Sequence, residues 1–125
     1  MGAGPAGLTG SIYASRYGIT NIVLGALPGG QVSESYLIDN YPGMEDISGT
    51  ELAKKIFTHA QKYGTEFIIA KAESVKKTPD GFEVELENKA KIKGKTVLLA
   101  TGNQRKKLNI PGEAAFQGKG VSYCA

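Results

Sequence analysis

The stretch "GAGPAG", residues 2–7 of the 125-residue chain, matches the pattern Gly-x-Gly-x-x-Gly. In this pattern the first glycine allows a tight turn, the second lets the backbone approach a pyrophosphate, and the third lets the following helix pack closely. The N-terminus of that helix offers free N–H groups and a partial positive charge to phosphates. Residues 2–7 therefore indicate a nucleotide phosphate site, and a merely glycine-rich helix start is the alternative.

Cys124, near the other end, is the only cysteine in the sequence. One cysteine cannot form an internal disulfide, which fits a reducing cytoplasm better than secretion. A thiolate is a nucleophile and exchanges with disulfides. By composition alone, however, an isolated thiol is most often a structural or incidental feature.

Two features that usually accompany a dinucleotide-binding glycine motif are missing here. The motif should follow a strand, but only Met1 precedes Gly2. An acidic residue should follow the second strand and bind a ribose hydroxyl. The apolar run 21–24, which predicts that strand, is followed instead by Gly25 and Ala26.

Three further motifs favour a nucleotide site. "ATG" (100–102) ends an apolar run, and open α/β sheets bind ligands at the carboxyl ends of their strands. "LPGGQ" (27–31) and "DNYPG" (39–43) place small residues and side-chain amides in one long loop. Amides both donate and accept hydrogen bonds, which suits the edge of a heteroaromatic ring.

The elements that would position these motifs follow from hydrophobic periodicity. Helices are predicted after residue 4, ending at Gly18, and from a Ser48 cap to Gly64. Apolar runs predict a buried parallel strand at 21–24, a strand at 66–70 and a parallel-type strand at 96–102, with an antiparallel meander between the last two and a long loop over 25–47. This order predicts an α/β fold that carries an antiparallel insertion.

Composition narrows the function classes. The formal net charge is +3, but the lysines are scattered among acidic residues, which favours solvated surface charge over a nucleic-acid face. No apolar run approaches the roughly 20 residues of a membrane span. His59 is the single histidine and has no second histidine or cysteine near it in the sequence, so we expect no metal site.

The motifs together resemble the first half of the low-molecular-weight thioredoxin reductases. The resemblance covers essentially the whole chain and rests on segments in family order: "GAGPAGLTGSIYASR", "GGQ", "DNYPG", "SGTELAKKIFTHAQKYG", "LLATG", "IPGE" and "GKGVSYCA". It implies a three-layer, Rossmann-like FAD/NAD(P)-binding domain with a mostly parallel sheet and an antiparallel β-meander insertion. It also implies that residues 1–125 are a partial FAD-binding domain without its first strand, which lies between residues 21–24 and 96–102 in the family sheet.

The resemblance implies a role for each of several residues. Those expected to contact FAD are Gly2, Gly4, Pro5 and Ala6 at the pyrophosphate, Gly30, Gln31 and Asn40 toward the flavin, Ala72 near the adenine, and Ala100, Thr101 and Gly102 beside the dinucleotide. Cys124 matches the first cysteine of a Cys-x-x-Cys redox pair, whose second member would fall beyond Ala125. Gly25 departs from the acidic ribose-binding pattern.

In that family NADPH reduces FAD, FAD reduces the cysteine pair, and the dithiol reduces thioredoxin. By resemblance we expect a cytoplasmic, homodimeric parent enzyme whose NADPH-binding domain is absent from this chain, and we expect the 125-residue chain alone not to be catalytically competent. Two alternatives remain open: part of a related ferredoxin or flavodoxin NADP reductase, which needs no cysteine pair, and a non-catalytic interaction module.

Overall fold

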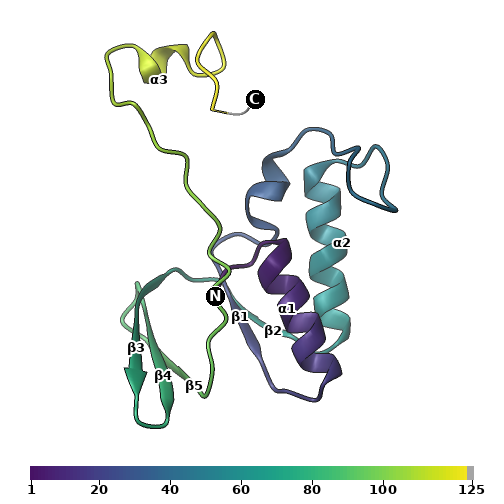
Figure 1. The fold of residues 1–125 in the computed structure, drawn as a ribbon, viewed down its shortest axis with the longest axis vertical. Coiled ribbons are helices and arrows are strands. Elements are labelled where there is room, and N and C mark those ends of the chain that lie inside the picture. Colours follow the sequence, from purple (N-terminus) through teal and green to yellow (C-terminus); the bar gives the residue numbers. More distant parts are fainter. Residues whose placement is uncertain (124–125) are drawn as a thin grey trace.

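The computed structural model describes residues 1–123. Its elements are, in chain order, α1 (Pro5–Arg16), β1 (Ile22–Leu24), the 3-10 helix η1 (Gly30–Glu34), α2 (Gly49–Lys62), β2 (Glu66–Ile68), β3 (Ala72–Thr78), β4 (Gly81–Leu86), β5 (Lys91–Gly94) and α3 (Glu113–Phe116). Helices α1 and α2 form one layer, the parallel pair β1–β2 the middle, and the antiparallel sheet β3–β4–β5 the third (Figure 1). The predicted α/β fold with a parallel sheet and an antiparallel meander is confirmed.

Local chemistry explains where the two long helices begin and end. Pro5 is the first residue of α1, where its fixed φ and missing N–H are tolerated. The Ser48 side chain caps α2 by accepting a hydrogen bond from the Glu51 backbone N–H at 3.2 Å, as the capping pattern predicted. Gly18 and Gly64 follow the helix ends with φ of 71° and 80°, a left-handed conformation that favours glycine.

Two apolar clusters join the three layers. The first packs the helices on the parallel strands, with Leu8 fully buried and Phe57 meeting Phe67 edge-on at 5.1 Å between ring centroids. The second packs the meander on the opposite face, through Leu24, Val84 and Leu86 among others. The parallel pair is therefore covered on both faces, as its almost continuous apolar sequence predicted.

The prediction of a strand at 96–102 is wrong, because no residue of this segment is assigned to a strand. The backbone of this segment pairs with Met1: the Met1 amino group donates to Leu98 O at 2.6 Å, and Ala100 N–H donates to Met1 O at 2.8 Å. Gly2 N–H donates to Leu24 O at 2.8 Å on the other side. Residues 1–2 thus lie between β1 and the 96–100 segment, and a strand ladder cannot form with so short a neighbour.

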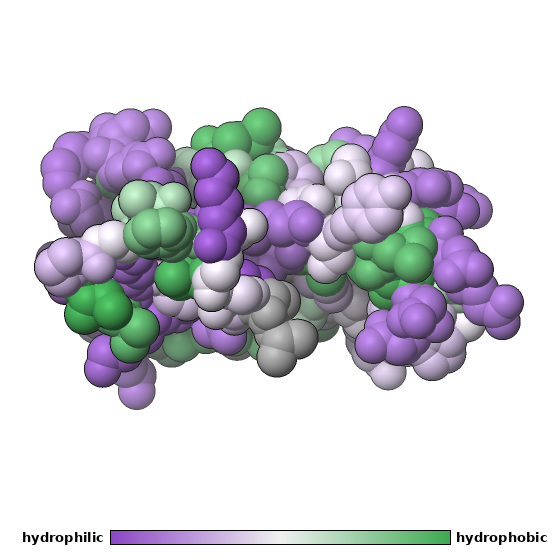
Figure 2. Space-filling model, turned by 90° about the horizontal axis from the view of Figure 1, so that it is seen from above, coloured by the Kyte–Doolittle hydropathy of each residue, from purple (hydrophilic) through white to green (hydrophobic). Residues whose placement is uncertain are grey.

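Beyond Gly102 the chain leaves the three layers and leads to α3 (Figure 1). Viewed from above, hydrophobic patches lie between the hydrophilic ends of the molecule (Figure 2). From residue 98 onward, the large exposed apolar side chains are Leu98, Leu99, Leu108, Ile110 and Phe116. No helix within residues 1–123 has the length and hydrophobicity to cross a bilayer.

Candidate functional site

A pocket of about 580 Å³ lies at the N-terminal end of α1. Three segments line it, residues 2–6, 25–32 and 100–103, although Pro28 and Gly29 are not among its lining residues. Its volume falls within the roughly 300–1,000 Å³ of typical small-molecule sites. The sequence motifs "GAGPAG", "LPGGQ" and "ATG" therefore meet in one place.

The glycine loop forms the inner wall, and its geometry excludes side chains. Gly2 has φ of 101°, and a Cβ atom there would collide with the carbonyl oxygen of Ala100. A Cβ atom on Gly7 would collide with the carbonyl oxygen of Gly2. The tight turn thus requires the first glycine of the motif, and the close packing of the helix requires the third, as the pattern predicts.

The first turn of α1 supplies the polar groups of this wall. Gly4 is the N-cap residue and provides no side-chain hydrogen bond to the turn, and Pro5 has no N–H. The backbone N–H groups of Ala6 and Gly7 precede the first intrahelical bond, which Leu8 N–H makes to Gly4 O at 3.0 Å. These donors and the positive end of the helix dipole suit an anionic group such as a phosphate.

A second pair of glycines faces the loop from residues 25–32. Gly29 N–H donates to Ala3 O at 2.7 Å, which ties the two segments together. Gly30 has φ of 57°, and a Cβ atom there would lie 3.2 Å from the Cα of Gly4. The two walls are therefore close backbone surfaces, between which a flat or extended ligand would meet main-chain atoms.

Gln31 connects residues 25–32 to the third lining segment of the pocket, residues 100–103. Its side-chain amide donates from Nε2 to the backbone oxygen of Asn103 at 2.8 Å. This bond spans the pocket between η1 and the segment that follows "ATG". In this structure the Gln31 amide is engaged with the protein itself.

Nine of the residues predicted from the sequence line the pocket: Gly2, Gly4, Pro5, Ala6, Gly30, Gln31, Ala100, Thr101 and Gly102. Asn40 and Ala72 are not among its lining residues. Asn40 is exposed, in a loop that is closed by bridges between Ile38 and Ile47 and between Tyr41 and Met44. Ala72 begins β3, where it pairs with Leu86 and packs on the second apolar cluster. Cys124 lies outside the described residues.

Sequence reasoning missed several lining residues: Ala3, Gly25, Ala26, Leu27, Val32 and Asn103. Their position in the sequence could have identified them, since each lies within or directly beside a motif. Gly25 was noted only for the acid that it lacks, yet a Cβ atom there would lie 2.6 Å from the Cβ of Ala3. The end of β1 is therefore too crowded at Gly25 for any side chain.

None of the described lining residues carries an ionisable side chain. Elsewhere in residues 1–123, no group of three or more His, Cys, Asp or Glu side chains could hold a metal ion. His59 is exposed and lies against Tyr63, with 5.5 Å between ring centroids. The pocket can therefore bind and orient a ligand, but its described side chains include no ionisable acid or base.

Comparison with known proteins agrees with this geometry. The profile of the pyridine nucleotide-disulphide oxidoreductase family matches residues 1–125. The thioredoxin reductase of Bacillus subtilis is 39% identical over the whole chain, and so is a B. subtilis NADH dehydrogenase over 99% of it. The chain spans 40% of the first relative's length and 24% of the second's.

Solved structures give the same result. The thioredoxin reductase of Lactococcus lactis superposes with a TM-score of 0.87 at 34% identity, over 98% of this chain and 41% of that one. The thioredoxin reductase of T. acidophilum superposes with a TM-score of 0.84 at 37% identity, over 95% and 39%.

Proposed function

Because the chain belongs to the pyridine nucleotide-disulphide oxidoreductase family, we propose that it is the FAD-binding part of a thioredoxin-reductase-like flavoprotein. The observation that carries this proposal is the pocket in which the α1 N-terminus, the second glycine pair and residues 100–103 converge. The similarity to thioredoxin reductases over the whole chain supports it.

The residues present fit a dinucleotide. The donors of the first α1 turn suit a pyrophosphate, and the Cβ position of Gly4 is open space, which the ligand can use because glycine has no side chain. We assign Gly2, Gly4, Pro5 and Ala6 to the pyrophosphate. The remaining contacts are Gly30, Gln31 and Asn40 toward the flavin, Ala72 toward the adenine, and Ala100, Thr101 and Gly102 along the dinucleotide. The contacts of Asn40 and Ala72 remain predictions from the family resemblance.

When bound, FAD supplies the exchange of electrons between a pyridine nucleotide and a disulfide. This chain's pocket residues would hold and orient it and exclude water. Cys124 would supply one thiol of the redox pair, and one thiol cannot complete a dithiol cycle. The proposal for the whole protein includes NADPH as reductant, thioredoxin as acceptor, a homodimer and a cytoplasmic location.

The test is a titration of the purified chain with FAD, in which flavin fluorescence monitors binding. We expect saturable binding, and we expect Gly4→Ala to weaken it by about tenfold or more, which corresponds to about 1.4 kcal/mol. Gly4 has φ of −77°, and the nearest atom to its Cβ position is 3.9 Å away, so the substitution fits the free protein and fills only the pocket.

Thr9→Ala is the matched control, because Thr9 is exposed on α1, one turn from the pocket. It should bind FAD as the unmodified chain does. A folded chain that binds no FAD would refute the proposed cofactor, and equal binding by Gly4→Ala would refute the proposed position.

A second candidate concerns the acceptor. The NADH dehydrogenase of B. subtilis shares this same piece at 39% identity, so the piece is not confined to proteins named thioredoxin reductase. A flavoprotein that passes electrons elsewhere, such as a ferredoxin or flavodoxin NADP reductase, would use the same pocket without Cys124. Replacement of Cys124 by Ser in a protein that includes the second cysteine separates the two, since only the dithiol enzyme loses disulfide reduction.

An interaction module is favoured by one observation only. Leu98 and Leu99 are 57% and 66% exposed, in a segment whose backbone bonds to Met1 at Leu98 and Ala100. Such an edge invites strand addition by a partner or a second copy. A strictly monomeric chain in sedimentation would weaken this alternative.

A further inference from the structure

One hydrogen bond across the pocket joins two parts of the chain that are anchored very differently. Gln31 Nε2 donates to the backbone oxygen of Asn103 at 2.8 Å, and both residues line the pocket. The bond therefore connects η1 to the chain that leaves the three layers after Gly102. A change in the pocket and a change in this exit can act on each other through it.

The backbone on the Gln31 side is firmly held. The Ser33 hydroxyl donates to Gly30 O at 2.6 Å within η1, and the Thr50 hydroxyl of α2 donates to Ser33 O at 3.2 Å. The backbone N–H of Gly49 also donates to Ser35 O at 2.9 Å, just after η1. The Gln31 side chain thus extends from an element that is tied to α2.

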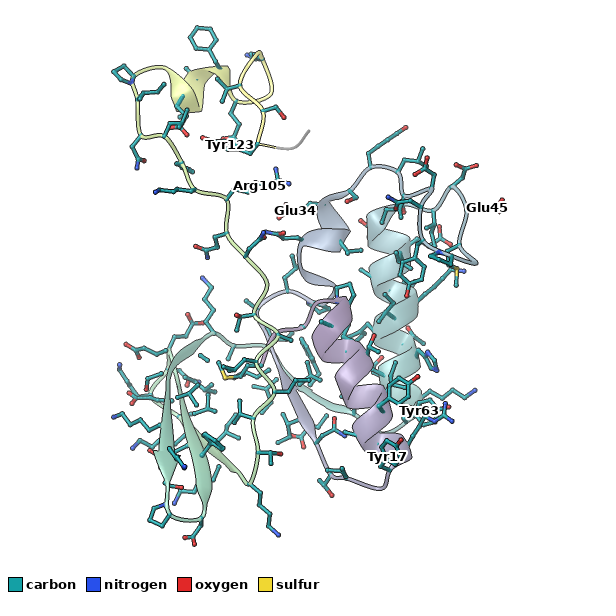
Figure 3. The ribbon with its side chains drawn as sticks, viewed as in Figure 1. Tyr17, Glu34, Glu45, Tyr63, Arg105 and Tyr123 are labelled. Atoms are coloured by element: carbon teal, nitrogen blue, oxygen red, sulfur yellow. The ribbon has the colours of Figure 1, made fainter. Side chains whose placement is uncertain are left out.

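Residues 101–107, which we call the connecting segment, have no such ties. Within residues 1–123, no backbone hydrogen bond involves any of them, and all seven are exposed. In Figure 3 the side chains of Arg105 in this segment and Glu34 of η1 point toward one another, so their opposite charges favour the same approach. The bond from Gln31 therefore anchors a segment that its own backbone bonds leave unsupported.

The Gln31–Asn103 bond is exposed to water in the free chain, because both residues are exposed. Water competes with such a bond, so its net contribution is small. A filled pocket would displace this water, since both partners line it, and a hydrogen bond is stronger in less polar surroundings. Occupancy of the pocket should therefore strengthen the bond.

The Gln31 amide keeps groups for a ligand while it holds Asn103. A glutamine side chain carries two N–H donors and one acceptor oxygen, and the bond to Asn103 uses one donor. Because a carbonyl must meet the N–H end of the amide, the bond also fixes the direction of the acceptor oxygen. Gln31 can thus serve the pocket and the connecting segment together.

We propose that Gln31 is a clasp: its bond to Asn103 tightens when the pocket is filled and holds the connecting segment against η1. Occupancy of the pocket and order in residues 101–107 are then coupled, and each favours the other by the same factor. The identity of the ligand, FAD, rests on the function proposed above. The bond itself is present without it.

Limited digestion of the full chain with trypsin reports on the connecting segment. Arg105, Lys106 and Lys107 are consecutive trypsin sites and are exposed, and exposed segments are where proteases cut folded chains. We expect saturating FAD to slow cleavage after residues 105–107 by about fivefold or more. Mass spectrometry identifies and quantifies the fragments.

Gln31→Met separates the clasp from simple shielding by the ligand, because it keeps the length of the side chain and cannot donate to Asn103. We expect it to bind FAD about fivefold or more weakly and, once saturated, to lose the protection of residues 105–107. Gln61→Met is the matched control, since Gln61 is exposed on α2 and does not line the pocket. It should be protected as the unmodified chain is.

Flavin fluorescence of the same samples separates the outcomes. Bound FAD that protects Gln31→Met as well as the unmodified chain would overturn the clasp and leave the proposed function standing. Bound FAD that leaves cleavage of the unmodified chain unchanged would do the same. A folded chain that binds no FAD would overturn the proposed function and the coupling together.

Discussion

At the scale of single residues, the site depends on where side chains are missing. Gly2 and Gly4 are two positions apart in the same motif, yet the structure constrains them differently. Gly2 has a positive φ and no room for a Cβ atom beside Ala100, whereas Gly4 has an ordinary φ and open space around its Cβ position. Folding thus requires Gly2, and the proposed binding requires Gly4.

We therefore expect Gly2→Ala to destabilise the fold by about 2 kcal/mol or more, because backbone strain and a steric clash add. Gly4→Ala should cost about 1 kcal/mol or less, because alanine is a poorer N-cap than glycine but meets no clash there. Urea denaturation followed by circular dichroism measures both. A similar loss in the two variants would contradict the distinction.

Gln31 shows what residue type alone cannot reveal. An amide in a glycine-rich loop predicted a contact with a flavin, and Gln31 does line the pocket. The structure adds that its Nε2 donates to Asn103 O, a partner 72 positions away in the sequence. The residue was identifiable from its motif, but its hydrogen-bond partner depends on the fold.

At the scale of elements, the meander carries a charge pair that joins β4 and β5. Lys91 Nζ lies 2.8 Å from Glu83 Oε1. The hydrogen bond from Lys91 lowers the pKa of Glu83, and the same bond raises the pKa of Lys91. The Glu83 contribution is therefore present above the unfolded-state pKa and is lost as the pH falls through the lower folded-state pKa.

Glu83→Gln should accordingly flatten the dependence of stability on pH on the acid side, since the folded state no longer gains from this ionisation. Exposed Glu87, in the turn that follows β4, is replaced by Gln as the control. Thermal unfolding between about pH 3 and pH 6 measures the effect, because a free Glu titrates near pH 4.3. If the stability of Glu83→Gln depends on pH on the acid side as that of the unmodified chain does, the Glu83–Lys91 pair contributes nothing to stability.

Elements were predictable where local signals decide them. The caps at Pro5 and Ser48 and the alternation of the meander sufficed for α1, α2 and β3–β5. The prediction of a strand at 96–102 was wrong because an apolar run indicates burial, whereas a strand also needs a hydrogen-bonded neighbouring strand along its length. The short helices η1 and α3 were missed because five and four residues give no readable period.

At the scale of the whole molecule, the parallel sheet has a gap. Met1 and Gly2 bond to Leu98, Ala100 and Leu24. Among residues 1–123, no other backbone hydrogen bond fills the space between the rest of β1 and residues 96–98. Apolar clusters on both faces would cover a strand placed there.

An extension of about five β-branched residues before Met1 should therefore pair with both segments and stabilise the chain. Each 1 kcal/mol gained raises the melting temperature by roughly 2–8 °C for domains of this size. Differential scanning calorimetry measures the change, and an extension of Gly and Ser residues is the control. Equal melting temperatures for the two extensions would contradict the gap.

The site itself is a whole-molecule property. Three motifs could be found in the sequence, and all three meet at one pocket, although only residues 25–32 follow a strand of the parallel sheet. The sequence could not show that Asn40 and Ala72 do not line this pocket. A loop of over twenty residues positions Asn40, and a register shift between Ala72 and Ser74 affects the position of Ala72.

The absence of ionisable side chains among the described pocket residues has a consequence for how such sites are detected. Alanine scanning is usually interpreted as the removal of atoms, but at the glycines of this wall an alanine adds a methyl group. In a scan of residues 2–6 and 25–32 we therefore expect the clearest losses at glycines such as Gly2 and Gly4. Substitutions that add a single methyl group are the informative probe, since here the empty volume, and not a functional group, selects the ligand.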